Sequence, residues 1–281
     1  MLKTGEQIFS CGAHDADSRL DRFISRQAGI SLRAARRLIE TGSVRVDGVP
    51  RPAGYKLRAG RMIAICSTGA VPCAPPYLVA ATAEYAAFFK PAGLHTVSLA
   101  GAAAPSLEAE LPRLCPKHDI ILLNRLDRDT SGLVLGALDA QAAQRFRDFE
   151  AKGLVDKRYL AVVTGEMPGE MTLKWALDTA DRAKVKVLDM QTPDALRWTE
   201  VRPLAGVSGS TLVEARIAKG ARHQIRAHLA RAGFPISGDV LYGADNAHTG
   251  LKLHHWRVAF PGFSAEIRPD WRGVTIPGGD G

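Results

Sequence analysis

The segment NRLDRDTSG, residues 124–132, places acids, arginines, an amide and hydroxyls between two apolar runs. The runs, at residues 120–123 and 133–135, have the composition of short strands. A carboxylate that is held in a loop between strands can serve as a nucleophile or as a general base. A solvated turn is the alternative, and from this stretch alone both interpretations stay open.

Two further polar residues lie in predicted regular elements. Tyr159 lies in a predicted strand over residues 155–163, on the face that it shares with Ala161 by period two. Position alone leaves open whether Tyr159 belongs to the core or to a site. Arg226 lies in a predicted helix whose apolar face includes Ile225.

The composition narrows the class of partner. The chain has 281 residues, and 37 Lys and Arg against 29 Asp and Glu give a formal net charge of +8 at pH 7. This surplus is compatible with a polyanionic partner, although charge alone does not identify one. The four cysteines form no Cys-x-x-Cys pair, so we expect reduced thiols in a cytoplasmic protein. No stretch approaches the roughly 18 apolar residues of a membrane span, and we expect neither a membrane nor a secretion signal.

Composition also predicts two domains. The first covers residues 17–66 and the second covers residues 78–272. A stretch rich in small residues and proline, residues 67–77, is the predicted linker. Residues 1–16 show no periodicity, and we expect a frayed tail there.

The first predicted domain contains a helix with two distinct faces. The helix covers residues 31–40, has Ser31 as its candidate N-cap and carries an apolar stripe. Its other side carries a basic stripe of Arg33, Arg36 and Arg37. A strand at residues 44–46 and a tight turn at Asp47-Gly48 follow. Such a stripe either solvates an exposed helix or contacts phosphates.

The pattern RLDRFISRQAGISLRAARRLIETGSVRVDG, residues 19–48, resembles the small RNA-binding module first described in ribosomal protein S-four. The resemblance implies that the basic helix and the following turn meet RNA. This agrees with phosphate contacts by the basic stripe. Phosphate contacts orient a protein on RNA without reading its bases, so no sequence preference follows.

Five segments of the second domain resemble the RluA-like family of pseudouridine synthases, in the order of that family. They are FFKPAGL, NRLDRDTSGLVLGAL, KRYLAVVTG, GARHQIRAHLARAGFPISGDVLYG and LKLHHWRVAFP. The resemblance implies an α+β fold, with a mixed, largely antiparallel sheet and flanking helices, beside the small N-terminal α+β domain. It also implies that uridines of structured RNA are isomerised to pseudouridine, with ribosomal RNA the first expected substrate and transfer RNA the second. The reaction needs no metal, nucleotide or redox cofactor, and we expect none.

The resemblance assigns roles to the candidate residues. Asp127 matches the essential aspartate of the family, which acts as nucleophile or base when uracil is detached. Arg226 is expected against Asp127, where an opposite charge favours the ionised carboxylate. Tyr159 is expected to stack on the flipped base and to move the proton of its carbon 5. Arg125 is expected to fill the space that the base leaves or to grip a nearby phosphate.

The chain departs from the family pattern at two places. Asn124 stands where the family usually has His, and Ala221-Arg222 stands where it has Arg-Thr. The second change moves an arginine by one residue, and we expect RNA contacts from Arg222, His223 and Gln224. These departures keep open a second hypothesis, an RNA-binding or ribosome-assembly factor that has this fold and little or no turnover.

Two further expectations concern alternatives to this chemistry. A glycoside hydrolase that uses Asp127 and Asp129 is a third and weaker hypothesis, because nothing else suggests sugar binding. The pairs His223 with His228 and His254 with His255 are poorly spaced for metal ligation, so we expect no metal site. We also expect a monomer.

Overall fold

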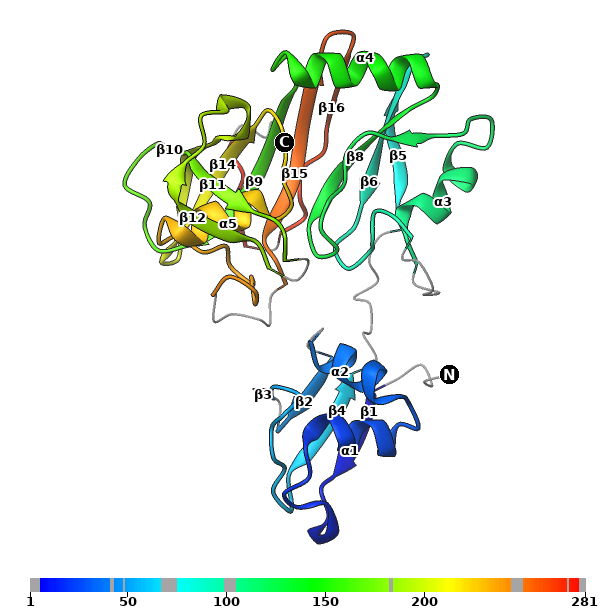
Figure 1. Ribbon diagram of the computed structural model, residues 1–281, viewed down its shortest axis with the longest axis vertical. Helices are drawn as coiled ribbons and strands as arrows, with labels where there is room; N and C mark the ends of the chain where they lie inside the picture. Colours follow the sequence, from blue (N-terminus) through cyan, green and yellow to red (C-terminus); the bar gives the residue numbers. More distant parts are fainter. Residues whose placement is uncertain are drawn as a thin grey trace. The chain divides into compact units, whose positions relative to one another are not determined.

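The computed structural model describes residues 6–40, 43–47, 49–66, 75–98, 105–181, 184–243, 250–271 and 273–277. The chain forms two compact units, residues 1–72 and 73–281, which are described separately below (Figure 1). Residues 67–74 of the predicted linker, Gly48 of the predicted turn and the side chain of Arg37 lie outside the described residues. The predicted domain limits of 17–66 and 78–272 remain predictions.

The N-terminal unit contains an antiparallel sheet and two α-helices. Its strands pair in the order β1-β4-β2-β3. They are β1 (Glu6–Ser10), β2 (Val44–Val46), β3 (Val49–Pro50) and β4 (Met62–Cys66). The helical elements are the 3-10 helix η1 (Ala13–Asp15), α1 (Leu20–Gln27) and α2 (Leu32–Glu40). Helix α2 confirms the predicted second helix, and Ser31 Oγ accepts a hydrogen bond from the backbone N–H of Ala34 at 3.2 Å.

The prediction of a frayed tail over residues 1–16 is wrong for the described part of that segment. Residues 6–10 form β1, which pairs with β4 from Glu6 opposite Cys66 to Ser10 opposite Met62. This strand has no periodic signal in the sequence, because Ile8 is exposed while its neighbour Phe9 packs on the core. One apolar residue on each face produces no alternating pattern.

The C-terminal unit is organised around one ten-stranded sheet. Eight strands follow one another in the order β10-β13-β14-β9-β15-β8-β6-β5, while β16 pairs with β15 and β7 pairs with β8. The strands are β5 (Tyr77–Ala81), β6 (Tyr85–Lys90), β7 (Ile121–Leu122), β8 (Ser131–Ala137), β9 (Asp156–Thr164), β10 (Met171–Leu173), β13 (Thr199–Val207), β14 (Ser210–Ile217), β15 (Leu253–Phe260) and β16 (Phe263–Glu266). Within the described part of this sheet, β15 and β8 alone pair in parallel. The expected mixed, largely antiparallel sheet is confirmed.

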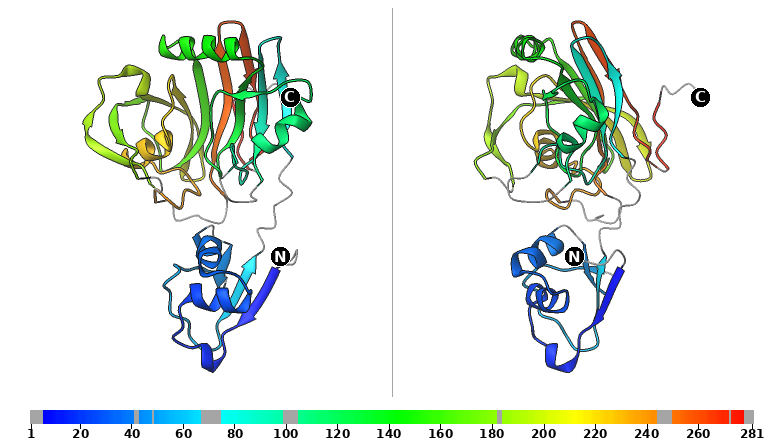
Figure 2. Two further views of the ribbon diagram at one scale, coloured as in Figure 1. Left: turned by 45° about the vertical axis from the view of Figure 1, so that its right-hand side comes forward. Right: turned by 90° about the vertical axis from the view of Figure 1, so that its right-hand side faces the viewer.

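Helices and a small hairpin flank this sheet. The elements are α3 (Leu107–Leu114), α4 (Ala140–Ala151), the 3-10 helix η2 (Ala195–Arg197), α5 (Gln224–Arg231) and the pair β11 (Trp175–Asp178) and β12 (Lys186–Gln191). Helix α4 runs across the direction of the neighbouring strands (Figures 1 and 2). Its N-cap is Asp139, whose Oδ1 accepts from the backbone N–H of Ala142 at 2.7 Å. No helix within the described residues is long and apolar enough to cross a membrane.

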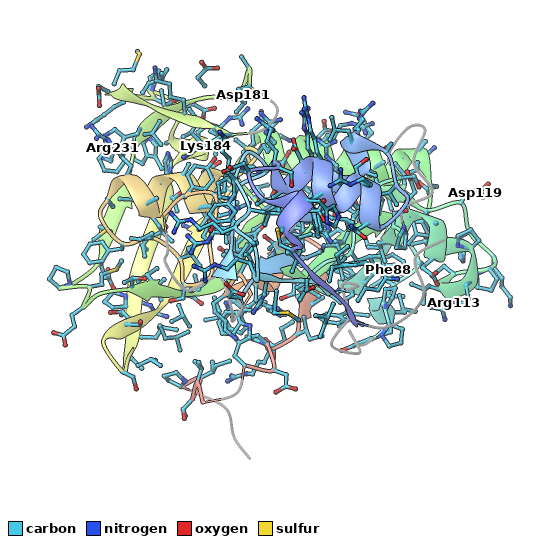
Figure 3. All side chains as sticks on the ribbon, turned by 90° about the horizontal axis from the view of Figure 1, so that it is seen from below. Phe88, Arg113, Asp119, Asp181, Lys184 and Arg231 are labelled. Carbon is cyan, nitrogen blue, oxygen red and sulfur yellow. The ribbon has the colours of Figure 1, made fainter. Side chains whose placement is uncertain are left out.

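The two faces of β9 point into different apolar clusters. Tyr159 and Ala161 belong to the same buried cluster as Ile225 of α5. Leu160 and Val162 point the other way, where the C-terminal residues Trp271, Val274 and Ile276 cover them. In Figure 3, Arg231 at the end of α5 lies on one side of the unit and Arg113 of α3 on the other. Period-two alternation therefore puts Tyr159 on the face that carries α5.

Candidate active site

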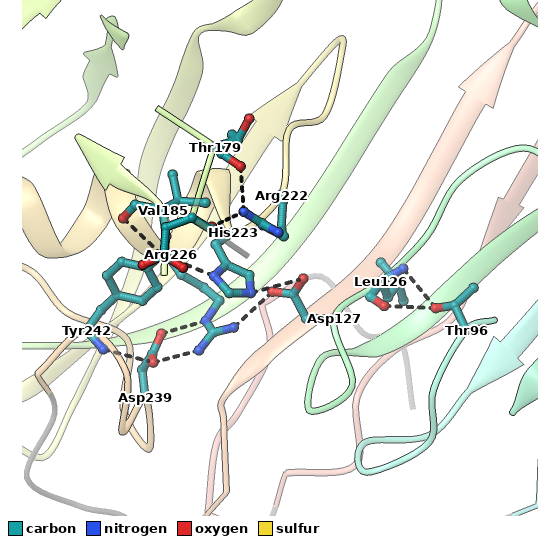
Figure 4. Close-up of polar contacts among 11 residues, drawn as sticks. Thr96, Leu126, Asp127, Thr179, Val185, Arg222, His223, Arg226, Asp239 and Tyr242 are labelled. Carbon is teal, nitrogen blue, oxygen red and sulfur yellow. Dashed lines mark hydrogen bonds and ion pairs between the residues drawn. The ribbon is translucent and has the colours of Figure 1, made fainter. Parts of the chain in front are cut away.

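The loop between β7 and β8 carries Asp127 and is fixed on both sides of that residue. Thr96 Oγ1 donates to the backbone oxygen of Leu126 at 2.8 Å and accepts from its N–H at 3.0 Å (Figure 4). The fully buried Lys90 donates from Nζ to the backbone oxygen of Arg128 at 3.1 Å. Because both neighbours of Asp127 are held, the carboxylate is presented by a rigid backbone.

Gly132 and Asn124 join this loop to β8. Gly132 has φ +117°, and a Cβ there would lie 2.3 Å from the backbone oxygen of His255, so this position requires glycine. Asn124 Oδ1 accepts from the backbone N–H of Leu135 at 2.7 Å. The asparagine that replaces the family's usual histidine thus supports the loop. Both predicted flanking strands are present, but only β8 is buried, since Ile121 of β7 is exposed.

Helix α5 brings Arg226 against Asp127. Arg226 Nη1 donates to Asp127 Oδ2 at 3.0 Å, and Figure 4 shows the two side chains facing each other. The Nε and Nη2 atoms of Arg226 donate to Asp239 Oδ2 and Oδ1 at 2.7 and 2.8 Å. Burial lowers the pKa of Arg226, but the bonds from Asp239 and Asp127 outweigh it and raise the pKa. The guanidinium therefore stays charged between two carboxylates.

Asp239 and Tyr242 were not singled out from the sequence. Asp239 is buried, and its Oδ1 also accepts from the backbone N–H of Leu241 at 3.0 Å and of Tyr242 at 3.2 Å. The ring of Tyr242 packs on Arg226, whose guanidinium carbon lies 5.4 Å from the ring centroid. Both residues lie in GDVLYG, the end of a stretch that carries the family resemblance. That motif was the available signal, but it did not reveal what either side chain contacts.

His223 approaches the other oxygen of Asp127. It precedes α5 with φ 52°, and its Nε2 lies 3.7 Å from Asp127 Oδ1. Its Nδ1 lies 3.1 Å from the hydroxyl of Tyr242. Burial is the main cause of a lowered pKa for His223, and it outweighs the opposite effect of Asp127. The imidazole is therefore uncharged at neutral pH, and its approach to Asp127 is not an ion pair there.

Arg222 and Gln224 are directed at protein groups. Arg222 Nη2 donates to the backbone oxygen of Thr179, after β11, at 2.7 Å (Figure 4). Gln224 is 2% exposed. Its Nε2 donates to the backbone oxygen of Arg197 at 2.8 Å, and its Oε1 accepts from the N–H of Ala221 at 2.9 Å. These bonds hold the amide of Gln224 to protein groups, and the expected RNA contact of Gln224 remains a prediction.

Tyr159 is stacked on His255. The ring centroids lie 4.5 Å apart and the planes are inclined by 14°. His255 is fully buried, and its Nδ1 lies 2.6 Å from the backbone oxygen of Leu133. Burial raises the pKa of Tyr159, with a smaller contribution from the charge of Asp127, so the phenol is protonated at neutral pH. With one ring face on His255, a base could stack only on the other face.

These side chains surround one cavity of about 1030 Å³. Its volume exceeds the roughly 300 Å³ at which small-molecule sites begin, so it can admit a nucleotide with part of its neighbours. Arg125 lies on its wall and is exposed. The lining includes Asp127, Tyr159, His223, Arg226, Lys157 and Glu150.

Within the described residues, no group of three or more His, Cys, Asp or Glu side chains could hold a metal ion. The buried histidines instead bond protein groups. His228 Nδ1 lies 2.9 Å from Thr199 Oγ1, and His254 Nδ1 lies 2.8 Å from Ser131 Oγ. Burial lowers the pKa of His228, and it lowers that of His254 to about 4. Both imidazoles are therefore neutral at neutral pH.

In the N-terminal unit, the basic stripe of α2 is anchored by Asp21. Arg36 Nε donates to Asp21 Oδ2 at 2.9 Å, and Arg19 Nε and Nη2 donate to its two oxygens at 3.1 and 3.0 Å. The bond from Arg19 is the largest cause that lowers the pKa of Asp21 to about 2. The side chains of Arg19 and Arg36 remain 45% and 48% exposed, and Arg33 is exposed as well. Asp21 therefore fixes two guanidinium groups at the surface.

A family model described as RNA pseudouridylate synthase matches residues 84–231, a range that contains Asp127, Tyr159 and Arg226. The chain belongs to this family. A second family model, the S4 domain, matches residues 18–63. The family, its isomerase class and the RNA-binding N-terminal module predicted from the sequence are thereby confirmed.

Relatives with similar sequences carry related names. An "Uncharacterized RNA pseudouridine synthase" of Chloroflexus aurantiacus is 29% identical over 99% of this chain and 92% of its own length. A "Ribosomal large subunit pseudouridine synthase C" of Salmonella typhimurium is 30% identical over 93% of this chain and 91% of its own length. The similarity to both therefore extends over both units.

A solved structure has the same fold as the C-terminal unit. "Human RNA Pseudouridylate Synthase Domain Containing 1" superposes with a TM-score of 0.57 at 22% identity. The superposition covers 69% of this chain and 83% of the human one. This likeness confirms the predicted fold.

Proposed function

We propose that this protein isomerises specific uridines of large-subunit ribosomal RNA to pseudouridine, with Asp127 as the group that breaks the bond between ribose and base. The choice of RNA rests on relatives named ribosomal large subunit pseudouridine synthase C. Transfer RNA is the second candidate. The observation that carries the proposal is the bond of 3.0 Å between Arg226 and Asp127 in a cavity that also contains Tyr159.

The surroundings of Asp127 suit a reacting carboxylate. Its side chain is 23% exposed, and Arg226 bonds only its Oδ2. Oδ1 faces the neutral imidazole of His223 at 3.7 Å, which is too long for a hydrogen bond. One oxygen is therefore stabilised while the other can reach a substrate. This arrangement serves attack on the ribose, attack on the base, or general-base assistance, and we leave these three routes open.

We propose that Tyr159 is the platform for the flipped base. One ring face is supported by His255, and the ring lines the cavity, so a base that enters the cavity would stack on the opposite face. Because its pKa is raised, the phenol is a hydrogen-bond donor at neutral pH. To accept the carbon 5 proton, Tyr159 would first have to lose its own proton, and burial opposes that loss. Its state at rest thus favours the stacking role over direct uptake of the proton.

We propose RNA contacts outside the cavity as well. Arg125 is exposed at the cavity wall, where it can fill the space of the flipped base or grip a phosphate. Arg33 and the anchored Arg36 present charge for phosphates in the S4 domain, and the predicted contact of Arg37 completes that stripe. Arg222 and His223 are further candidates, and both also bond protein groups. We also propose that the protein is a monomer in the cytoplasm.

The hypothesis of an RNA-binding factor without turnover loses the features that favoured it. Asn124 bonds the backbone of β8, and the N–H of Ala221 bonds Gln224. Neither residue displaces Asp127 from Arg226. The hydrolase hypothesis is not supported by Asp129, whose side chain is 59% exposed and lies 3.9 Å from Arg128.

The test is a map of pseudouridines in total RNA from cells with and without the gene. Restoring the gene should restore at least one missing site in large-subunit ribosomal RNA. The variant Asp127→Asn, which has nearly the same size, should restore none. The proposal fails if no site disappears without the gene, or if the Asn variant restores every site.

A further inference from the structure

The starting observation is that Arg226 is shared unequally by two carboxylates. Asp239 takes the forked edge of the guanidinium, with bonds from Nε at 2.7 Å and from Nη2 at 2.8 Å. Asp127 receives one bond, from Nη1 at 3.0 Å. Arginine bonds carboxylates most strongly through two parallel N–H groups. The better arrangement is therefore given to the residue that faces away from the cavity lining.

Asp239, which has the stronger bonding to Arg226, is also the more buried of the two carboxylates. The side chain of Asp239 has no exposed surface, whereas that of Asp127 is 23% exposed. Asp127 lines the cavity. A buried carboxylate with two charge-assisted bonds is an anchor, and an accessible carboxylate with one such bond can still meet a substrate.

A tight turn delivers Asp239 to this position. Gly238 has φ +78°, and a Cβ there would lie 2.1 Å from the backbone oxygen of Gly250, so two backbone segments meet at this glycine. The N–H groups of Leu241 and Tyr242 then bond Asp239 Oδ1. The same turn places the ring of Tyr242 on the guanidinium. Arg226 is thus held by charge at its edge and by a ring on its face.

We propose that Asp239 is a positioning residue that keeps Arg226 bonded to a single oxygen of Asp127. By occupying the forked edge, Asp239 prevents Arg226 from turning that edge toward Asp127. A two-bond pair between Arg226 and Asp127 would engage both carboxylate oxygens and make each of them less reactive toward the ribose or the base. Asp239 therefore acts on the reaction through Arg226 and does not touch the substrate. This inference rests on the proposed function of Asp127.

The substitution Asp239→Asn separates this role from the turn. An asparagine keeps one oxygen, which can still accept from the N–H groups of Leu241 and Tyr242. Its NH₂ group replaces the oxygen that faces Arg226 Nε, and two donors cannot bond each other. The fork is broken while the turn is kept. Arg226 then keeps one bond, from Nη2 to the remaining oxygen, and loses the second bond and the charge that hold its forked edge away from Asp127.

The experiment compares wild type and Asp239→Asn on large-subunit ribosomal RNA with enzyme in excess. The RNA dissociation constant should stay within a factor of about two, while the rate of pseudouridine formation from bound RNA should fall about a hundredfold, as for a misplaced catalytic group. Asp239→Glu keeps the charge but moves it by one methylene, and it should show the same split to a smaller degree. It also serves as the test if the Asn variant does not fold.

A second readout distinguishes positioning through Arg226 from a general structural effect. If Asp239 acts only through Arg226, then Arg226→Lys together with Asp239→Asn should be little slower than Arg226→Lys alone, because lysine has no forked edge to position. Asp189→Asn is the matched control. It removes the charge of an exposed aspartate in β12 that pairs with Arg231, which lies in α5 like Arg226. It should leave the RNA dissociation constant and the rate of pseudouridine formation unchanged.

The outcomes separate a failure of the positioning role of Asp239 from a failure of the proposed function. A wild-type rate in a folded Asp239→Asn or Asp239→Glu variant overturns the inference, and so do fully additive losses in the double variant. If wild type itself forms no pseudouridine in this RNA, the proposed function fails instead. The two failures are therefore distinguishable within one set of reactions.

Discussion

Two charged clusters in this protein have opposite composition. In the N-terminal unit, one buried carboxylate, Asp21, bonds two arginines. In the C-terminal unit, one buried guanidinium, Arg226, bonds the carboxylates of Asp127 and Asp239. Each cluster keeps its minority charge buried, and at least one member of the majority remains accessible. The accessible charges are cations in the first cluster and an anion in the second.

The sign of the accessible charge suits the part of the RNA that each cluster is proposed to contact. Arg19 and Arg36 are nearly half exposed, at 45% and 48%, and a surplus of cations suits RNA phosphates. Asp127 is the accessible member of the other cluster, and a surplus anion suits attack or proton uptake at a nucleoside. In each cluster the buried member fixes the direction of the more accessible groups.

Removal of Arg226 should have the largest effect. The variant Arg226→Ala leaves two carboxylates beside each other without their cation, which costs about 3–5 kcal/mol of stability when one partner of a buried pair is lost. Turnover of bound RNA should fall by about a hundredfold or more, with a much smaller change in RNA affinity. Single-turnover rates and dissociation constants measure both. Loss of affinity with full turnover of the RNA that does bind would contradict the role of Arg226.

Asp21→Asn tests the N-terminal cluster, because two explanations predict opposite changes in RNA affinity. The substitution raises the net charge of the protein by one, and charge alone would make RNA binding tighter. Our comparison predicts the reverse, a loss of about tenfold in affinity, because Arg19 and Arg36 lose the carboxylate that orders them. Binding of ribosomal RNA fragments to the full chain measures this. Tighter binding by the variant would show that the arginines need no anchor.

The stability of the N-terminal unit should depend on pH through Asp21. Its pKa is about 2 in the folded protein. An unfolded chain has a value of about 3.9. The folded value is the lower one, so the stabilisation is complete above about pH 4 and is lost as the pH falls toward 2. Amide hydrogen exchange of α1 and α2 in the full chain follows this loss, and Asp21→Asn should remove that part of the pH dependence. An identical acid response in both proteins would exclude Asp21 as its origin.

Arg33→Ala should have the smallest effect. Arg33 is exposed on α2 and is proposed to contact one phosphate. Removing one such contact should weaken binding similarly for all RNA sequences and lower the slope of log affinity against log salt by about one. Turnover of bound RNA should be unchanged. Arg113→Ala, an exposed arginine of α3 that pairs with Glu110, is the control for loss of one charge. An equal salt slope for Arg33→Ala and wild type would remove Arg33 from the interface.

The elements with local signals were predictable from the sequence. Helices α2, α4 and α5 show apolar periodicity or a capping side chain, as with Ser31 and Asp139. The placement of Tyr159 and Ala161 on one face followed from period two in β9. Strand β1 was missed because its two apolar residues fall on opposite faces, and such a strand is specified by its pairing with β4.

The contacts within the site were less predictable. Arg226 and Asp127 could be brought together only through the family resemblance, because the two residues are 99 positions apart in the chain. The pairing of Arg226 with Asp239, and the stacking of Tyr159 on His255, depend on which strands and turns become neighbours in the fold. The protein bonds of Gln224 were likewise not predictable. Its position in a family motif suggested an RNA contact, which remains a prediction, and gave no sign that its amide bonds the backbone of Arg197.

The most direct test of the account is the single-turnover formation of pseudouridine by Asp127→Asn on large-subunit ribosomal RNA, with the RNA dissociation constant measured in parallel. The side chain of Asp127 is 23% exposed in the cavity and is bonded by Arg226, so an amide of the same size should be accommodated. The account predicts unchanged affinity and no detectable pseudouridine. Formation of pseudouridine by this variant at the wild-type rate would contradict it.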